Sequence, residues 1–256
     1  MNKIINYDNL RKFCYSNDHL INGEIKGIVL EFVGLGGMTM YNNDLEIGIN
    51  YAKNNIVYII PYYNPWSWMN KNTILFVNEI IEVIINHYGL MDAKIVSTGK
   101  SMGGLCSLVY ARYGKINNAK VVKVVSNCPV CDLVYHYSER DDLPRTLYSA
   151  FFNEEGDIQN ALSKYSPIHL VKEMPDIDYV IFHCLEDKAV NIDNHSRKFI
   201  NLMNEYNIKL IEVPGRGHCD LSDEALKLFY DEIANILWFY IFLFYFSSVC
   251  VIILMY

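Results

Sequence analysis

The feature that most constrains this chain is a serine between two glycines, where a buried strand is predicted to turn sharply into a helix. The apolar run 93–97 precedes Gly99, Ser101 and Gly103, and residues 104–113 then read as a helix that ends at Gly114. We expect the turn to strain the serine backbone and to push its hydroxyl clear of the sheet. A Cβ at either flanking glycine should collide with a neighbouring strand or helix.

The rest of the chain alternates strand and helix signals. Short apolar runs predict strands at 27–33, 55–60, 93–97, 120–126, 179–185 and 209–213, with helices near 44–53, 73–88, 104–113 and 195–206 and a last helix after residue 213. Strands that alternate with helices form parallel sheets covered on both faces. The pattern therefore predicts an α/β protein with a mostly parallel, doubly wound sheet.

The alternation breaks for about forty residues, from 128 to 171, and resumes at Asp178. Residues 133–165 are richer in charge and tyrosine than the strands, so we expect a helical insertion, a cap or lid at about 130–170. A length of 256 residues suits one core. We expect one catalytic domain over 1–237, followed by a hydrophobic tail over 238–256.

A serine hydroxyl needs a base to take its proton and an acid to orient that base. His218 lies between glycine-flanked loop residues after the 209–213 strand, so it can reach Ser101 and is the predicted base. Asp187 directly follows the 179–185 strand and is the predicted acid, with its neighbour Glu186 as the alternative. His195, eight residues after Asp187, is interpreted as a surface residue of a helix.

Other carboxylates are less suitable partners for His218. Asp176 and Asp178 precede their strand and should lie at the wrong end of the sheet, whereas Asp220 and Asp223 follow the histidine and are expected to cap the last helix.

An oxyanion needs backbone N–H groups that point at it. Met102, the residue after the serine, is one expected donor. The loop after the 27–33 strand supplies the other, with Leu35 preferred and Gly36 next; Gly34 and Gly36 let the backbone approach a substrate. Phosphate binding by this loop is disfavoured, because it lacks both the G-x-G-x-x-G spacing and a P-loop lysine.

An aromatic loop follows the 55–60 strand. The loop contains two prolines together with the aromatic residues Tyr63, Trp66 and Trp68. One interpretation is a wall of the substrate pocket. The alternative is that these rings pack against the insertion.

Charge and cysteine content exclude some classes of function. The net charge is −7 and no basic patch is present, so we expect no nucleic-acid partner. Seven cysteines without a visible signal peptide predict reduced thiols and a cytoplasmic location. Cys128 and Cys131 form a C-x-x-C pair without a second pair, so a metal or thiol role is disfavoured. Cys219, beside the predicted base, could confer sensitivity to oxidation. We expect no metal and no cofactor.

The end of the chain differs from its body. Residues 233–256 include a long aromatic and aliphatic stretch that is long enough to span a bilayer. A membrane contact through 236–256 and a non-native tail both fit, because no Lys or Arg flanks the stretch to set an orientation.

These motifs resemble those of the α/β-hydrolases, and most closely those of prolyl-oligopeptidase-like serine peptidases and related carboxylesterases. The resemblance covers residues 26–236 and rests on the 33–37 loop, the 99–104 motif, residues 165–168, the 183–190 segment and the Gly217-His218 pair. The chain departs from the family at Val33, usually histidine, and at Cys184, usually glycine. The resemblance implies the chain order Ser101, Asp187, His218 and a covalent acyl-enzyme.

The function that we expect is a serine hydrolase acting on carboxylic esters of small or medium size, because the chain has no room for the propeller domain of the larger peptidases. Hydrolysis of short peptides is the alternative. A third hypothesis is a catalytically silent relative that binds a ligand without turning it over.

Overall fold

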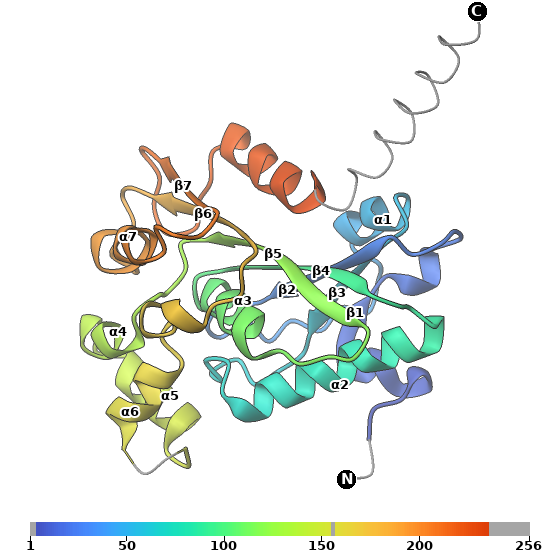
Figure 1. The fold of residues 1–256 in the computed structure, drawn as a ribbon, viewed down its shortest axis with the longest axis horizontal. Helices are drawn as coiled ribbons and strands as arrows, with labels where there is room; N and C mark the ends of the chain where they lie inside the picture. The colour runs from blue at the N-terminus through green and yellow to red at the C-terminus, as the bar shows by residue number, and fades with distance from the viewer. Residues whose placement is uncertain (1–3, 155–156, 236–256) are drawn as a thin grey trace, which may run out of the picture.

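A seven-stranded sheet with helices on both faces organises the part of the chain that the computed structural model describes, residues 4–154 and 157–235 (Figure 1). The strands are β1 (Cys14–Ser16), β2 (Gly27–Phe32), β3 (Ile56–Pro61), β4 (Ala93–Lys100), β5 (Ala119–Asn127), β6 (Asp178–Cys184) and β7 (Ile208–Val213). The helices are α1 (Glu46–Ala52), α2 (Lys71–Tyr88), α3 (Met102–Tyr113), α4 (Leu133–Glu139), α5 (Leu143–Phe151), α6 (Ile158–Lys164) and α7 (Lys198–Leu202), and another helix covers 223–235.

The sheet confirms the predicted mostly parallel architecture. Its strand order is β1-β3-β2-β4-β5-β6-β7, and every neighbouring pair is parallel except β1 with β3. The antiparallel edge strand β1 was not predicted, because three residues are too few to show a period.

Helix α2 illustrates why these segments become helices. Its buried residues Val77, Ile80, Ile81 and Ile84 recur at helical spacing and form one apolar stripe. The Asn70 side chain accepts a hydrogen bond from the Thr73 N–H at its start, and a left-handed Gly89 ends it.

Two sets of helices cover the two faces of the sheet. Apolar residues of α2, α3 and α7 pack against one face, and those of α1 and the 223–235 helix pack against the other (Figure 1). The expected helices near 44–53, 73–88 and 104–113 are therefore confirmed, with ends shifted by one or two residues at most.

The predicted insertion is helical. Between β5 and β6 the chain forms α4, α5 and α6, whose apolar residues join the core that α2 and α3 share. Asp132 caps α4 by accepting from the Tyr135 N–H, and Asp157 caps α6 in the same way from Gln159. That the insertion acts as a lid stays a prediction.

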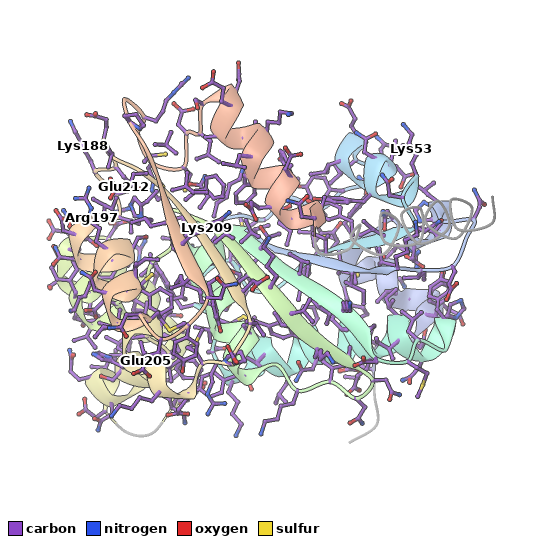
Figure 2. The ribbon with its side chains drawn as sticks, turned by 45° about the horizontal axis from the view of Figure 1, so that its top comes forward. Lys53, Lys188, Arg197, Glu205, Lys209 and Glu212 are labelled. Atoms are coloured by element: carbon purple, nitrogen blue, oxygen red, sulfur yellow. The ribbon has the colours of Figure 1, made fainter. Side chains whose placement is uncertain are left out.

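The expected helix at 195–206 begins differently. A short π-helix over Asp193–Arg197 leads into the short α7, and His195 is one of its buried residues. Its interpretation as a surface residue is wrong, because His195 is fully buried. Arg197, by contrast, is exposed at the sheet edge, where its Nε donates to Glu212 of β7 at 2.8 Å (Figure 2).

Parallel pairing brings the carboxyl ends of the central strands to one edge. Phe32 pairs with Gly99, Lys100 with Asn127, and Cys184 with Val213. The loops that follow β2, β4, β6 and β7 therefore start side by side, and these loops carry the predicted site residues. Ligands of open α/β sheets bind at this edge.

Within residues 4–154 and 157–235, no helix combines the length and the apolar composition that crossing a membrane requires. The predicted membrane contact through 236–256 and the predicted domain boundary near residue 237 lie outside the described residues.

Candidate active site

The turn between β4 and α3 is as tight as its sequence predicts. Ser101 has φ 57° and ψ −123°, a conformation that L-residues rarely adopt. A Cβ on Gly99 would lie 2.3 Å from the Gly103 carbonyl oxygen, and one on Gly103 would lie 2.1 Å from that of Phe32. Both glycines are therefore required by close backbone approach, and the expectation of collisions is confirmed.

Three of the predicted residues meet at this turn. His218 Nε2 lies 2.8 Å from Ser101 Oγ, and His218 Nδ1 lies 2.7 Å from Asp187 Oδ2. The serine follows β4, the aspartate follows β6 and the histidine follows β7. Because Asp187 is an acceptor, His218 carries its proton on Nδ1, and Nε2 is left to accept from the serine hydroxyl.

Both carboxylate oxygens of Asp187 accept hydrogen bonds. Its side chain is fully buried, and Oδ1 accepts from the N–H groups of Ala189 and Val190 at 2.8 and 2.9 Å. Burial alone would raise its pKa, but hydrogen bonds from His183 and His218 and from the Val190 N–H hold that pKa well below its usual range. The alternative acid Glu186 is exposed, and among the described residues the carboxylate that pairs with His218 is that of Asp187.

His218 is the more exposed partner of the pair, with a side chain 30% accessible. Burial lowers its pKa, but the hydrogen bond and the charge of Asp187, with a contribution from Cys128, outweigh that effect and raise the pKa to about 9. The histidine therefore gains basicity from Asp187.

Two supporting residues were not found from the sequence. Asn127, at the end of β5, accepts from the Ser101 N–H through its carbonyl at 2.9 Å, and its Nδ2 donates to the Cys219 carbonyl at 3.2 Å. It thus joins the serine turn to the histidine loop. His183 is fully buried, with Nε2 3.0 Å from the Val190 carbonyl and 3.5 Å from Asp187 Oδ2. Their positions at strand ends were the available signal.

The two predicted oxyanion donors of the loop after β2 differ in whether their N–H groups already have a partner. Gly36 N–H donates to the Pro65 carbonyl at 3.1 Å, and Gly37 N–H donates to that of Gly34 at 3.0 Å. Leu35 N–H has no partner among the described residues. This difference favours Leu35 over Gly36 as a donor. Gly36 has φ +78°, which accounts for a glycine there.

Met102 and Tyr63 are two further residues that the sequence predicts at the site. Met102 is the first residue of α3, so its N–H has no intrahelical acceptor. Tyr63 is buried, and its hydroxyl donates to the Val33 carbonyl at 2.9 Å, which fixes the backbone just before Gly34. A Cβ on Gly34 would find only ordinary contacts, 3.6 Å from the Lys100 carbonyl.

The aromatic loop divides between the two interpretations given to it. Trp68 is 1% exposed, and its indole N–H donates to Thr146 Oγ1 of α5 at 3.1 Å. This ring packs against the insertion, as the alternative predicts. Trp66 is 46% exposed and is the indole of this loop that faces solvent.

Groups of metal-ligating side chains gather at three places in the described chain. One contains His136, Glu139 and His195. His195 Nδ1 accepts from the backbone N–H groups of Cys131 and Asp132 at 3.1 and 3.2 Å, so Nε2 holds the proton and donates to Glu139 at 2.9 Å. Both nitrogens are engaged, and a metal could bind only by displacing these hydrogen bonds.

A second group is Cys128, His183 and Asp187. His183 Nδ1 lies 2.7 Å from the Ser196 hydroxyl while Nε2 faces the Val190 carbonyl, so this histidine too is fully engaged. The third group consists of Cys128, His218 and Cys219.

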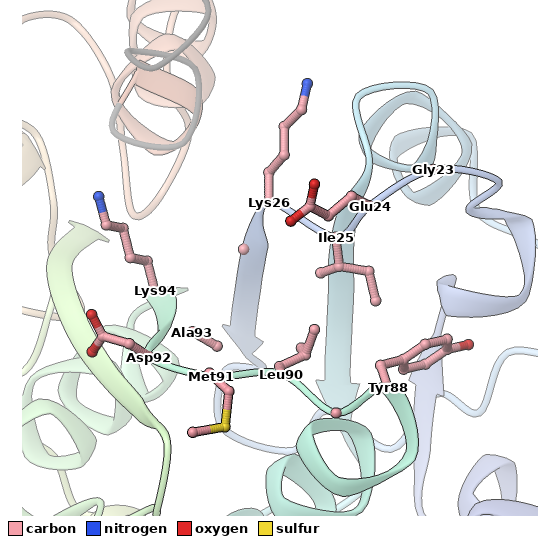
Figure 3. Close-up of a pocket in the computed structure, with 12 residues that line it drawn as sticks. Gly23, Glu24, Ile25, Lys26, Tyr88, Leu90, Met91, Asp92, Ala93 and Lys94 are labelled. Atoms are coloured by element: carbon pink, nitrogen blue, oxygen red, sulfur yellow. The ribbon is translucent and has the colours of Figure 1, made fainter.

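A pocket lies at the other end of the sheet. Residues 23–27 before and at the start of β2, and residues 88–94 before and at the start of β4, line it (Figure 3). Its rim carries both signs of charge, from Lys26 and Lys94 and from Glu24 and Asp92. Because it faces the amino ends of the strands, it is remote from the loop edge that carries Ser101.

The fold is that of the α/β-hydrolases. More narrowly, the chain belongs to the prolyl oligopeptidase family, whose sequence profile matches residues 69–240. No curated protein sequence matches the chain.

Solved structures are similar to it in fold at low sequence identity. The acylaminoacyl peptidase of Pyrococcus horikoshii is 14% identical with a TM-score of 0.60, over 77% of this chain and 34% of that one. Esterase B from Lactobacillus Rhamnosis is 13% identical with a TM-score of 0.63, over 84% and 76%. A truncated carbohydrate esterase from gut microbiota is 19% identical with a TM-score of 0.64, over 84% and 86%. The chain spans about a third of the length of the peptidase.

Proposed function

We propose that this chain is a serine hydrolase that cleaves carboxylic esters of small or medium size through a covalent acyl-enzyme. The observation that carries the proposal is the continuous set of hydrogen-bond contacts from Ser101 Oγ through His218 to the buried Asp187. These residues lie in three separate loops, and their order along the chain is that of the α/β-hydrolase triad.

In the first step Ser101 Oγ attacks the carbonyl carbon while His218 Nε2 takes the hydroxyl proton. Asp187 keeps the proton on Nδ1 and stabilises the imidazolium that forms. The carbonyl oxygen becomes an oxyanion, and the N–H groups of Leu35 and Met102 are the proposed donors to it. Loss of one such donor typically lowers turnover by about 10²–10³.

His218 then gives its proton to the leaving group, the bond between the carbonyl carbon and that group breaks, and the acyl group stays on Ser101. A water molecule repeats the sequence, with His218 again as base, and releases the acid. Each step uses side chains and N–H groups of this chain together with water.

Hydrolysis of short peptides is the second candidate, and membership of the prolyl oligopeptidase family favours it. An amine leaves less readily than an alcohol and must be protonated as it departs. The two candidates therefore differ in how much a reaction depends on proton donation by His218.

The test compares a p-nitrophenyl ester with a p-nitroanilide that carries the same acyl group. We expect a burst of p-nitrophenol from the wild type, equal to the amount of protein, and loss of the burst in Ser101→Ala. Ser138→Ala, on the exposed side of α4, is the matched control. A higher kcat/KM for the anilide would establish the peptidase candidate. Turnover of neither substrate, together with binding of both by a folded protein, would overturn the hydrolase and favour a silent relative.

A further inference from the structure

Two cysteines lie against the ring of the proposed base, and the proposed reaction uses neither. Cys219 Sγ is 3.6 Å from His218 Nε2, and one ligand atom each of Cys128, His218 and Cys219 lies within 4.8 Å of the others. The three residues come from the end of β5 and from the loop after β7. Their arrangement is a tertiary one that no short motif encodes.

We propose that Cys128, Cys219 and His218 form a binding site for a thiophilic divalent cation such as Zn²⁺ or Cd²⁺. Tetrahedral zinc, with bonds of about 2.3 Å to sulfur and about 2.1 Å to nitrogen, separates a sulfur ligand from a nitrogen ligand by about 3.6 Å. Cys219 Sγ and His218 Nε2 are 3.6 Å apart, but Sγ also lies 3.8 Å from Nδ1, so the thiol lies beside the ring and must turn toward the Nε2 lone pair to share a cation. A substrate molecule or water can complete the fourth position.

The surroundings of His218 suit a metal ligand. His218 Nδ1 donates to Asp187, and a carboxylate behind a metal-bound histidine is a common supporting contact. The Nε2 lone pair accepts from the Ser101 hydroxyl at 2.8 Å, and a bound cation would displace that hydrogen bond. The Cys184 N–H donates to Cys128 Sγ at 3.4 Å and lowers the pKa of that thiol, but Cys219 and burial outweigh this bond and raise the pKa to about 11, so a bound cation must displace the Cys128 proton. Among the three groups of ligating side chains, this is the one whose histidine is accessible, since the His218 side chain is 30% exposed and those of His183 and His195 are fully buried.

A cation would reach the proposed site from the side of His218. Cys128 is fully buried, whereas Cys219 is partly exposed and the His218 side chain is 30% accessible. An ion would therefore meet Cys219 and His218 first and reach Cys128 with a small shift. The C-x-x-C pair is not the site, because Cys131 packs in a different apolar cluster from Cys128.

Binding has a consequence that rests on the proposed function. A cation on Nε2 occupies the lone pair that accepts the Ser101 proton, so the serine loses its base. The metal site itself depends on geometry alone. Metal binding and loss of hydrolysis are thus separate observations.

The experiment titrates the reduced full chain with Cd²⁺ and follows the ultraviolet absorption of the cadmium–thiolate bonds. A Cys250→Ala background removes the cysteine that lies outside the described residues. We expect one Cd²⁺ per chain, an affinity at least tenfold weaker in Cys219→Ala and in Cys128→Ala, and no change in Cys131→Ala. Zn²⁺ should compete for the site. If Cys128→Ala does not fold, the half-exposed Cys219→Ala carries the test.

Undiminished affinity in Cys219→Ala, loss of binding only in Cys131→Ala, or no absorption in the folded parent would each overturn the site. A second measurement follows labelling by a fluorophosphonate. We expect Cd²⁺ to slow it at least tenfold and a chelator to restore it. Cadmium absorption without any labelling of the metal-free protein would keep the metal site and refute the proposed hydrolase; labelling that Cd²⁺ does not slow while bound would refute the coupling.

Discussion

Among the histidine–carboxylate pairs of the described residues, those of His218 and His195 differ in what the second ring nitrogen does. His218 faces Asp187 at 2.7 Å, and His195 faces Glu139 at 2.9 Å. The remaining nitrogen of His218 meets the Ser101 hydroxyl, whereas that of His195 accepts from the N–H groups of Cys131 and Asp132. One pair has the geometry for proton transfer, and the other joins the insertion to the segment before α7.

The difference shows that a histidine beside a carboxylate is not by itself a candidate base. His218 uses the carboxylate to hold its proton on Nδ1, which leaves Nε2 free to accept. In His195 the carboxylate binds the Nε2 proton and the backbone occupies Nδ1. Exposure follows the same division, because the His218 side chain is 30% accessible and that of His195 is fully buried.

The largest effect that separates the pairs is expected from Asp187→Asn. The amide can present its NH₂ to His218 and so favour the wrong tautomer. By comparison with other triads, we expect kcat on the p-nitrophenyl ester to fall by about 10⁴. Asp220→Asn, at an exposed aspartate of the loop that carries His218, should retain wild-type kcat. Loss of less than tenfold in Asp187→Asn would remove Asp187 from the proposed triad.

His195→Phe is expected to affect folding instead. Phenylalanine keeps a ring in the buried space but leaves the N–H groups of Cys131 and Asp132 without an acceptor, which should lower the free energy of unfolding by about 2–6 kcal/mol. Urea unfolding measures it. His169→Phe, at an exposed histidine, is the control. An unchanged unfolding free energy would show that the buried pair does not hold the insertion.

The pH dependence of kcat/KM reports the protonation state of His218. His218 must be neutral to accept a proton, and its pKa is raised to about 9, so kcat/KM should increase about tenfold per pH unit from pH 6.5 towards 9. In Asp187→Asn the charge that raises the pKa is absent, and the midpoint should move to lower pH. A profile that is flat between pH 6.5 and 9 would contradict a raised pKa at the proposed base.

The smallest effect is expected from Tyr63→Phe. This change removes the hydroxyl that donates to the Val33 carbonyl, and so loosens the backbone before Gly34 without touching the serine. One hydrogen bond of about 1 kcal/mol corresponds to a roughly fivefold lower kcat. Tyr148→Phe, at an exposed tyrosine of α5, should change nothing. A Tyr63→Phe variant that equals wild type would show that this bond does not position the loop.

Much of the arrangement was predictable from local sequence. The strands and most helices follow from periodic apolar runs, and the positions of Ser101, Asp187 and His218 follow from the ends of three such runs. Parallel pairing then brings these ends together, so strand prediction alone was enough to place the three residues at one edge.

What could not be predicted depends on contacts between distant segments. His195 was placed on the surface because its local pattern indicates a helix, and the pattern does not show that a π-helix and the insertion bury it. The cluster of Cys128 with Cys219 and the bridge through Asn127 join residues about ninety positions apart. A single sequence carries no signal for such pairs.

The measurement that tests the central claim most directly is labelling by a fluorophosphonate, with the modified residue located by peptide mass spectrometry. The account predicts one adduct, on Ser101, formed by the wild type and by His195→Phe but absent from Ser101→Ala and at least 10³-fold slower in His218→Ala. An adduct on another residue, no adduct on a folded wild type, or undiminished labelling of His218→Ala would contradict it.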